Sequence, residues 1–340
     1  MFDVMAIGNA LVDHEFVLSD AELEETELTR GNMTLATLDE QQQLLAYFQL
    51  ANIAPSKQAG GGSAANTMFA FASLGGKPFY ACRVGDDAQG QFYLQDLNQA
   101  GVATSDKSIH DGGVTGSCVV AVTHDGERTM QTYLGTSSEI CADNVDFDAL
   151  TQAGWLYLEG YLAMSESIQP AMTQLRQQAG LHGAKIAVSF ADPAVVKFAK
   201  EGLLNMLGNT VEVIFCNSEE ARLFTDKKQL KAAARALLDY CNIAVITDGA
   251  NGALIAQKMT QKPNLEPVFF DIPTPVVNVV DTNGAGDNYA GAFLFGLSQH
   301  YSLHECGRLA SEVAAQVIQQ FGPRLESEIY QDISRRVLVA

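Results

Sequence analysis

Residues 211–248 read VEVIFCNSEEARLFTDKKQLKAAARALLDYCNIAVITD, and this stretch decides the fold class. An apolar run, Val211–Asn217, is followed by a helical pattern at Leu230–Tyr240 and by a second apolar run, Ala244–Asp248. Runs that are apolar throughout are typical of strands covered on both faces, as in a parallel sheet. The stretch therefore predicts one strand–helix–strand unit of an α/β domain.

The same order recurs along the 340-residue chain. Further predicted strands are Asp3–Gly8, Pro78–Gly85, Trp155–Gly160 and Lys185–Ala191. Ala64–Leu74 is a predicted helix, and another follows the capping box of Ser302 and Glu305 and ends at Gly322-Pro323. No repeat or Pro-rich linker divides the chain, so we expect one large α/β domain rather than two independent ones.

Two stretches interrupt this pattern. Residues 14–52 contain two capping-box spacings around a short alternating piece, Met33–Leu35, and residues 113–135 contain Asp125-Gly126 between alternating apolar and polar residues. Asp-Gly in that setting predicts a β-hairpin. We expect the two stretches to form one small β-rich lid, and residues 1–13, 53–112 and 136–340 to form the large domain.

The chain is strongly acidic, with 21 Lys and Arg residues against 40 Asp and Glu residues and a formal net charge of −19. Such a surface repels polyphosphate backbones and anionic membranes, so we expect neither nucleic acid nor a membrane as a partner. Six scattered cysteines without a CxxC pair indicate reduced, mostly buried thiols. Without a bilayer-length apolar run or a basic secretory start, the sequence predicts a cytoplasmic protein.

The predicted strands all end in polar or glycine residues. In an open parallel sheet, ligands bind at the carboxyl ends of the strands. The residues that follow the strands include Asn9, Asp13, Glu159, Asn217, Glu220, Thr247 and Gly249. Ordinary loop polarity explains any one of them equally well, but the pattern as a whole favours a site for polyols, metals or phosphates at this edge.

Gly60–Asn66 reads GGGSAAN and opens a predicted helix with small residues, which allow a ligand to approach the backbone closely. The run also fits the G-x-G-x-x-A pattern of dinucleotide-binding oxidoreductases. That pattern requires a buried strand before the glycines, and Pro55–Gln58 is not one. The sequence therefore disfavours a dehydrogenase.

Asp281–Asp287 reads DTNGAGD and precedes the apolar segment Tyr289–Gly296. Backbone N–H groups at the start of a helix are free to bind an anion, so Gly284–Gly286 suits the charge that develops on a transferring phosphoryl group. Asp287 is placed to accept a proton from an attacking hydroxyl. The alternative is that Asp287 only stabilises the first turn of the helix.

Other catalytic patterns are missing: the sequence has no G-x-x-x-x-G-K-[ST], no H-R-D and no H-E-x-x-H. His300 and His304 have the i, i+4 spacing of a metal pair. Because Ser302 is predicted to cap a helix between them, we expect the two rings not to share a helix face.

The segments DTNGAGDNYAGAFL (281–294) and GGGSAANT (60–67) resemble the two signatures of the ribokinase family, the phosphofructokinase-B type of sugar and nucleoside kinases. GNALVD (8–13), RVGDDAQG (83–90), N-x-x-E (217–220) and TDGANG (247–252) are similar to family motifs and stand in family order. The resemblance implies a doubly wound, mainly parallel α/β sheet flanked by helices, with a small β-rich lid. It also implies a kinase that uses ATP and Mg²⁺.

The resemblance assigns roles to residues at the matching positions. Asp287 is implied as the general base, with an anion hole formed by Gly284, Ala285 and Gly286. The residues implied to hold the sugar hydroxyls are Asn9, Asp13, Gly61, Gly62 and Asn66. Asn217 and Glu220 are implied to orient Mg²⁺ and the ATP phosphates, largely through water, and the phosphate and nucleotide channel is implied at Thr247, Gly249 and Gly252. Asp281 and Thr282 lie in the loop beside which many members bind K⁺.

Several segments are most similar to the adenosine-kinase-like branch, namely GNALVD, RGNMTLAT (30–37), GERTMQTYLG (126–135) and QQFGPRL (319–325). The leading hypothesis is therefore phosphorylation of a primary hydroxyl on a ribosyl compound, with adenosine or another nucleoside preferred. The alternatives are a ribokinase- or fructokinase-type sugar kinase and a non-catalytic nucleoside- or sugar-binding protein on the same fold. The expected partner is a small-molecule sugar or nucleoside, and the chain is expected as a monomer or a lid-mediated homodimer.

Overall fold

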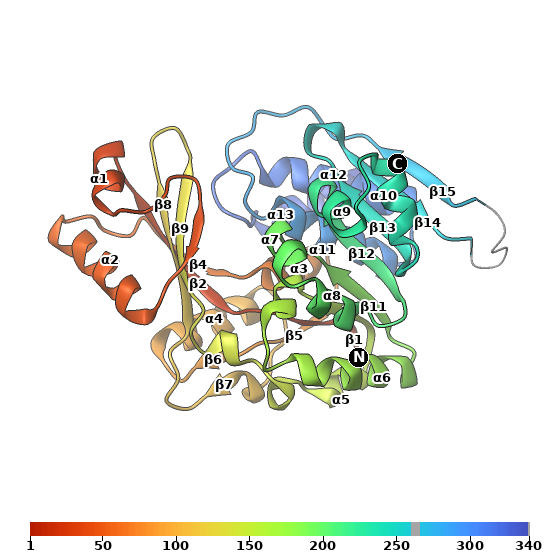
Figure 1. The fold of residues 1–340 in the computed structure, drawn as a ribbon, viewed down its shortest axis with the longest axis horizontal. Coiled ribbons are helices and arrows are strands. Elements are labelled where there is room, and N and C mark those ends of the chain that lie inside the picture. The colour runs from red at the N-terminus through yellow and green to blue at the C-terminus, as the bar shows by residue number, and fades with distance from the viewer. Residues whose placement is uncertain (260–265, 339–340) are drawn as a thin grey trace.

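The computed structural model describes residues 1–259 and 266–338. Within these residues the strands form a sheet of eight strands, a sheet of five and a separate pair (Figure 1). The large sheet has the order β15-β14-β13-β12-β11-β10-β1-β5. Its strands are β1 (Phe2–Ile7), β5 (Pro78–Ala81), β10 (Ala153–Leu158), β11 (Lys185–Ser189), β12 (Val211–Asn217), β13 (Cys241–Thr247), β14 (Ala253–Gln257) and β15 (Val268–Ile272). Neighbours from β5 to β13 pair in parallel, and only β14 and β15 run antiparallel to their described neighbours, which confirms a mainly parallel sheet.

One strand prediction was wrong. Pro78–Gly85 is not a single strand, because β5 ends at Ala81 and β6 (Val84–Gly85) pairs with β7 (Ile109–His110) outside the large sheet. Cys82 and Val84 are both fully buried on either side of this bend. The sequence does not reveal the end of β5, because buried apolar residues continue past the point where the chain leaves the edge of the sheet.

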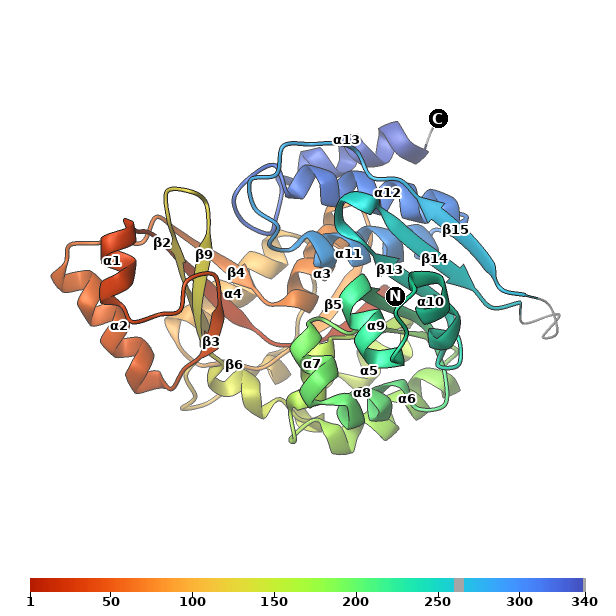
Figure 2. The ribbon, with the colours of Figure 1, turned by 45° about the horizontal axis from the view of Figure 1, so that its top comes forward.

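Helices cover both faces of the large sheet, as expected for a doubly wound fold (Figure 2). Side chains alternate along β12, since Val213 and Phe215 pack in one core and Ile214 and Cys216 in the other. The first core is covered by α3 (Ser63–Ser73), α4 (Ala88–Gln99), α11 (Ala285–Ser298), α12 (Leu303–Val317) and α13 (Ser327–Leu338). The second is covered by α5 (Phe147–Thr151), α6 (Met172–Leu181), α7 (Pro193–Phe198), α8 (Lys200–Leu207), α9 (Ser218–Thr225) and α10 (Leu230–Leu237). Short 3₁₀ turns are η1 (Asp106–Ser108), η2 (Gly135–Glu139), η3 (Ala142–Asn144), η4 (Gly160–Met164), η5 (Gln169–Ala171) and η6 (Gly249–Asn251).

The five-stranded sheet and two helices form the lid, which stands to one side of the large domain (Figure 1). Its elements are β2 (Leu11–Val17), β3 (Met33–Leu35), β4 (Lys57–Gly61), β8 (Gly116–Val122), β9 (Arg128–Tyr133), α1 (Asp20–Glu25) and α2 (Leu38–Leu50). β8 and β9 pair antiparallel around Asp125-Gly126, which confirms the predicted hairpin. The sheet reaches beyond residues 14–52 and 113–135, because β2 starts at Leu11 and β4 pairs with it.

Helix starts follow the predicted capping boxes. Ser19 with Glu22, Thr37 with Glu40 and Ser302 with Glu305 each exchange the two expected hydrogen bonds. His300 has a positive φ of 63° and precedes the cap of α12, so it shares no helix with His304. The prediction that the two residues do not share a helix face is confirmed.

Three further features limit the kinds of site available. No helix among the described residues is long and apolar enough to cross a membrane. All six cysteines are free, and all but the partly exposed Cys141 are buried. Within residues 1–259 and 266–338, no three His, Cys, Asp or Glu side chains are grouped to hold a metal ion.

Candidate active site

The predicted site residues come together at the carboxyl edge of the large sheet. Asn9 follows β1, Glu159 follows β10, Asn217 ends β12 and Thr247 ends β13. Asn217 and Thr247 are paired in register, so they lie side by side. In a parallel sheet this edge is where loops and helix N-termini meet a ligand.

The loop before α11 has a conformation that requires glycine. Gly284 is the N-cap residue with φ +73°, and a Cβ there would lie 2.4 Å from the Cβ of Pro323. Asn288 Nδ2 donates to the carbonyl oxygens of Gly284 and Pro323, at 2.7 Å each. Open space surrounds the position of a Cβ on Gly286, so this end of α11 is accessible to an anion. The Ala285 N–H donates to Thr282 O at 3.2 Å, so its use as an anion donor requires that bond to open.

Asp287 lies in the first turn of α11 and contacts the start of α3. Its Oδ1 accepts from Ser63 Oγ at 2.7 Å, and its Oδ2 accepts from Asn66 Nδ2 at 3.2 Å. Desolvation of the half-buried carboxyl raises the pKa of Asp287 to about 6, while the Ser63 and Asn66 bonds and nearby Arg324 act in the opposite direction. Asp287 is therefore largely ionised at neutral pH and suited to accept a proton.

Asn9 and Asp13 lie against the glycines of β4. A Cβ on Gly62 would be 2.3 Å from Asn9 O, and one on Gly61 would be 2.4 Å from Asp13 Oδ1. Asp13 lies within β2 of the lid rather than in a loop after the first strand. Burial raises the pKa of the Asp13 carboxyl to about 6, opposed by the positive charges of Arg324 and Arg128.

Glu159 is a buried carboxylate for which the sequence indicates no role beyond its place at a strand end. It accepts from Asn9 N at 3.2 Å, Asn9 Nδ2 at 3.0 Å and Ala64 N at 2.8 Å. Burial raises the pKa of Glu159 to about 7. Glu159 therefore ties the loop after β1 to the first turn of α3, beneath Asn9.

Asn217 and Glu220 form a tight capping box at the start of α9. Asn217 Oδ1 accepts from the N–H of Glu220 at 2.9 Å, and Asn217 Nδ2 donates to Glu220 Oε1 at 2.6 Å. Burial raises the pKa of Glu220 to about 7. Their amide and carboxylate oxygens are the ligand types that Mg²⁺ prefers, and the box fixes the two side chains relative to each other.

Gly249 and Gly252 shape the turn between β13 and β14. Both have positive φ, 55° and 87°. A Cβ on Gly252 would lie 2.1 Å from Ile272 O, whereas Gly249 has open space around it. The turn thus packs closely against β15 on one side and exposes its backbone on the other.

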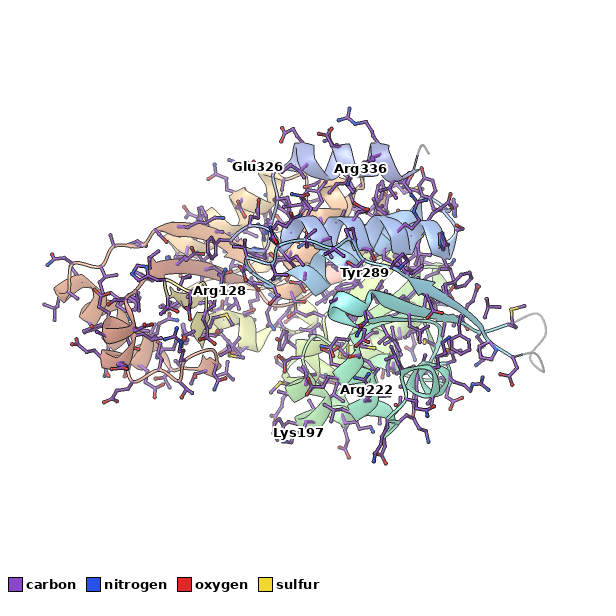
Figure 3. All side chains as sticks on the ribbon, turned by 90° about the horizontal axis from the view of Figure 1, so that it is seen from above. Arg128, Lys197, Arg222, Tyr289, Glu326 and Arg336 are labelled. Carbon is purple, nitrogen blue, oxygen red and sulfur yellow. The ribbon has the colours of Figure 1, made fainter. Side chains whose placement is uncertain are left out.

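Asp281 contacts the lid. Its Oδ2 accepts from Arg128 Nη1 at 2.5 Å and from Gly322 N at 3.0 Å, and its Oδ1 accepts from Asn283 N at 2.9 Å. Arg128 projects from β9, and both side chains of the ion pair are almost completely buried (Figure 3). A cation at the predicted position beside Asp281 and Thr282 therefore competes with the Arg128 guanidinium.

Comparison with known proteins agrees with this fold. Residues 30–329 match the family described as pfkB family carbohydrate kinase. The chain belongs to this family, and it is a phosphotransferase that acts on hydroxyl groups of sugars or nucleosides. Kinases of the family use ATP, typically with Mg²⁺.

Three individual proteins are similar to this chain over nearly its whole length. Adenosine kinase of Saccharomyces cerevisiae is 27% identical over 342 residues, which cover 96% of this chain and 97% of the relative. The crystal structure of adenosine kinase from Sinorhizobium meliloti is 34% identical with a TM-score of 0.84, covering 98% of this chain and 99% of that one. A probable sugar kinase from Rhizobium etli CFN 42 is 31% identical with a TM-score of 0.86, covering 100% and 99%.

Proposed function

We propose that this kinase transfers the γ-phosphoryl group of ATP to the primary hydroxyl of a ribosyl compound, with adenosine or a similar nucleoside preferred. Similarity to adenosine kinases over nearly the whole chain supports the proposal. The observation that carries it is an apolar lid surface next to the residues proposed to hold the sugar.

That surface is the face of the lid sheet opposite α1 and α2. Register places Cys118 beside Asp13, and Met130 beside both Val120 and Met33. Met33 and Leu35 are 46% and 54% exposed. Apolar side chains next to a hydroxyl-binding carboxylate suit an acceptor with a flat base attached to its sugar, because a free pentose has no apolar part to bury.

An open cavity of about 720 Å³ borders the same surface. Its walls include Leu35, Thr132, Leu134 and His110. Thr132 contacts Cys118, and Ser137, which lies between the cavity-lining Thr136 and Ser138, hydrogen-bonds Asn9. The cavity therefore continues the proposed sugar site and has room for a nucleobase.

In the proposed mechanism, Asn9 and Asp13 hold the sugar hydroxyls and direct the primary hydroxyl toward Asp287. Asp287 accepts the hydroxyl proton while the oxygen attacks the γ-phosphorus, and the ADP oxygen departs. The N-terminus of α11 at Gly286 stabilises the charge that develops on the phosphoryl oxygens. Mg²⁺ neutralises phosphate charge when bound, and Asn217 and Glu220 are proposed to hold it through water.

The nucleotide would lie along Thr247, Gly249 and Gly252, where Gly249 exposes the backbone of the turn after β13. K⁺ beside Asp281 and Thr282 stays a prediction, since Arg128 already pairs with Asp281. The cytoplasmic location and the choice between a monomer and a lid-mediated homodimer also stay predictions.

The test is an ATP-consumption assay with adenosine, other nucleosides, ribose and fructose as acceptors. We expect the highest kcat/KM with adenosine, and no turnover with 5′-deoxyadenosine, which keeps the base and lacks the primary hydroxyl. Turnover with ribose or fructose and none with nucleosides would instead support the sugar-kinase alternative. Binding without turnover for every acceptor would support the non-catalytic alternative.

A further inference from the structure

Arg324 belongs to a segment that is fixed to the helix carrying Asp287. Pro323 O accepts from Asn288 Nδ2 at 2.7 Å on one side of Arg324. On the other side, Leu325 N donates to Tyr330 OH at 3.3 Å, and Tyr330 OH in turn donates to Asn288 Oδ1 at 2.5 Å. The backbone around Arg324 therefore has a defined position relative to α11.

The Arg324 side chain is nine-tenths buried and lies between Gly60 of β4 and helix α3. Its Nε donates to Asn66 Oδ1 at 2.9 Å, and its Nη1 donates to Asp96 Oδ2 at 2.7 Å. The guanidinium also lies over the Phe69 ring, 4.7 Å from the centroid. Its Nη2 is buried without a partner among the described residues and lies 3.4 Å from where a Cβ on Gly60 would be.

The contact with Asn66 decides which end of the amide faces Asp287. A guanidinium can only donate hydrogen bonds, so it holds the amide oxygen of Asn66 and leaves Nδ2 to donate to Asp287. The opposite orientation would place Asn66 Oδ1 against the carboxylate and the amide N–H groups against the guanidinium. Arg324 thus disfavours the opposite orientation of the Asn66 amide, in which the contacts with Arg324 and with Asp287 would both be repulsive.

We propose that Arg324 is a positioning residue for phosphoryl transfer, which orients the Asn66 amide toward Asp287 and places a buried positive charge beside both Asp287 and Asp13. The inference rests on the proposed role of Asp287 as the general base. Arg324 itself transfers no proton, since a guanidinium stays protonated in proteins.

The charges around Asp287 come from several elements. Arg324 lowers the pKa of Asp287, and burial raises it. Glu159, Tyr157 and Tyr161 are close enough to sense the Asp287 charge, which raises the pKa of each. Removal of Arg324 would therefore take away the one positive charge among the described residues that lowers the pKa of Asp287, and would leave only the Ser63 and Asn66 hydrogen bonds to oppose desolvation.

Asp13 has a second cation nearby. Arg324 and Arg128 both lower the pKa of Asp13, Arg324 more strongly, while burial and Glu15 raise it. The Cys118 thiol also lies close, and the Asp13 charge raises its pKa. Asp13 therefore keeps Arg128 when Arg324 is removed, whereas Asp287 has no comparable second cation among the groups that shift it.

The experiment compares pH profiles of kcat, measured with saturating ATP and the best acceptor from the screen. Arg324→Met keeps much of the packing over Phe69 and should lower kcat by about 10–100-fold, the usual effect of removing a supporting hydrogen-bond partner. It should also move the acid limb of the profile up by about one pH unit. Arg324→Lys keeps the charge without the planar donors, so the acid limb should return toward wild type while kcat stays reduced.

Two control variants separate positioning from a general loss of structure. Asp96→Asn removes the ion pair but keeps the Asn66 contact, so the acid limb should stay in place. Arg336→Met removes an exposed arginine of α13 that pairs with Glu312 of α12, and no change in the profile is expected (Figure 3). Thermal unfolding of each variant reports the folded fraction.

A wild-type acid limb in Arg324→Met, or the same shift in Asp96→Asn, would overturn the positioning role. Asp287→Asn, assayed in parallel, tests the underlying assignment separately. If Asp287→Asn turned over like the wild type, the general-base role would fail whatever the Arg324 variants show.

Discussion

The two sheets of the molecule differ in how their faces are covered. Both faces of the large sheet are packed under helices, so neighbouring residues such as Val213 and Ile214 are fully buried in opposite cores. Among the described residues, the lid sheet carries helices on one face only, where Phe16 and Phe48 pack together. On its other face Cys118, Val120 and Val122 are buried at the centre, and Leu35 on the edge strand is exposed. The large sheet is packed under helices on both faces, whereas one face of the lid sheet carries no helix of the described chain and exposes Met33 and Leu35 on the edge strand β3.

This difference separates the chemical step from the choice of acceptor. Asp287, Ser63 and Asn66 lie where α11 packs on α3 in the large domain, and their positions are set by close contacts. On the edge strand of the lid, Met33 and Leu35 are exposed and are less constrained by packing. We therefore expect changes near Asp287 to alter turnover and changes on the lid face to alter acceptor binding.

The largest expected effect is that of Asp287→Asn, which keeps the shape of the side chain and removes the base. Turnover should fall by roughly 10²–10⁴, the usual contribution of a general base. ATP affinity, measured by calorimetry, should hardly change. The matched control is Asp332→Asn on the outer surface of α13, where full activity is expected.

If Asp287→Asn kept a turnover close to that of the wild type, the large domain could no longer be assigned the chemical step and the lid the choice of acceptor. It would leave Asp287 with the role of stabilising the first turn of α11 only.

The pH dependence of kcat should follow the ionisation of Asp287. Burial raises the pKa of this carboxyl to about 6, and only the ionised form accepts a proton, so activity is present above pH 6 and is lost as the pH falls through it. The loss should approach about tenfold per pH unit on the acid side. Asp13 has a similar pKa, so kcat with saturating acceptor is the quantity to measure.

The residual activity of Asp287→Asn should lack this acid limb. If the limb persisted unchanged in that variant, another group would be responsible for it.

Much of the large domain could be predicted because its strands are apolar throughout. The lid sheet could be predicted only in part. β4 reads KQAGG and has no strand-forming residues, and it is a strand because β2 lies beside it. Because β4 is not recognisable in the sequence, its partner β2 is not either, and Asp13 is expected in a loop. In the structure Asp13 lies within β2, between Val12 and His14.

The parts of the site that depend on local contacts could be predicted, and the parts that depend on contacts between distant residues could not. The capping box of Asn217 and Glu220 and the glycine turn before Asp287 are set by residues a few positions apart, and short motifs reveal them. Arg324 contacts Asn66 across 258 positions, and Arg128 contacts Asp281 across 153. No spacing rule links such residues, because the fold alone brings them together.

The metal network should respond to Asn217→Ala combined with Glu220→Ala. Removal of both oxygen-bearing side chains should raise the Mg²⁺ concentration needed for half-maximal rate by about 10–100-fold. The double variant also loses the α9 capping box, at a cost of about 1–2 kcal/mol in the free energy of unfolding. Titration of the rate with Mg²⁺ at fixed MgATP separates the two effects.

Glu219→Ala is the matched control, since Glu219 is exposed in the same helical turn and contributes no side chain to the capping box. An unchanged Mg²⁺ titration in the double variant would limit Asn217 and Glu220 to capping α9.

The smallest expected effect is on the open face of the lid. Leu35 is 54% exposed, so Leu35→Asp should leave the thermal stability nearly unchanged. Because the substitution removes the apolar surface that Leu35 is proposed to offer the base, the KM for a nucleoside should rise by about three- to tenfold, while kcat and the KM for ATP stay close to wild type. Leu50→Asp changes an 85% exposed leucine at the end of α2 and should alter none of these values. A fall in kcat without a rise in acceptor KM for Leu35→Asp would mean that the lid takes part in the chemical step, because removing an interaction that stabilises the ground and transition states equally raises KM alone.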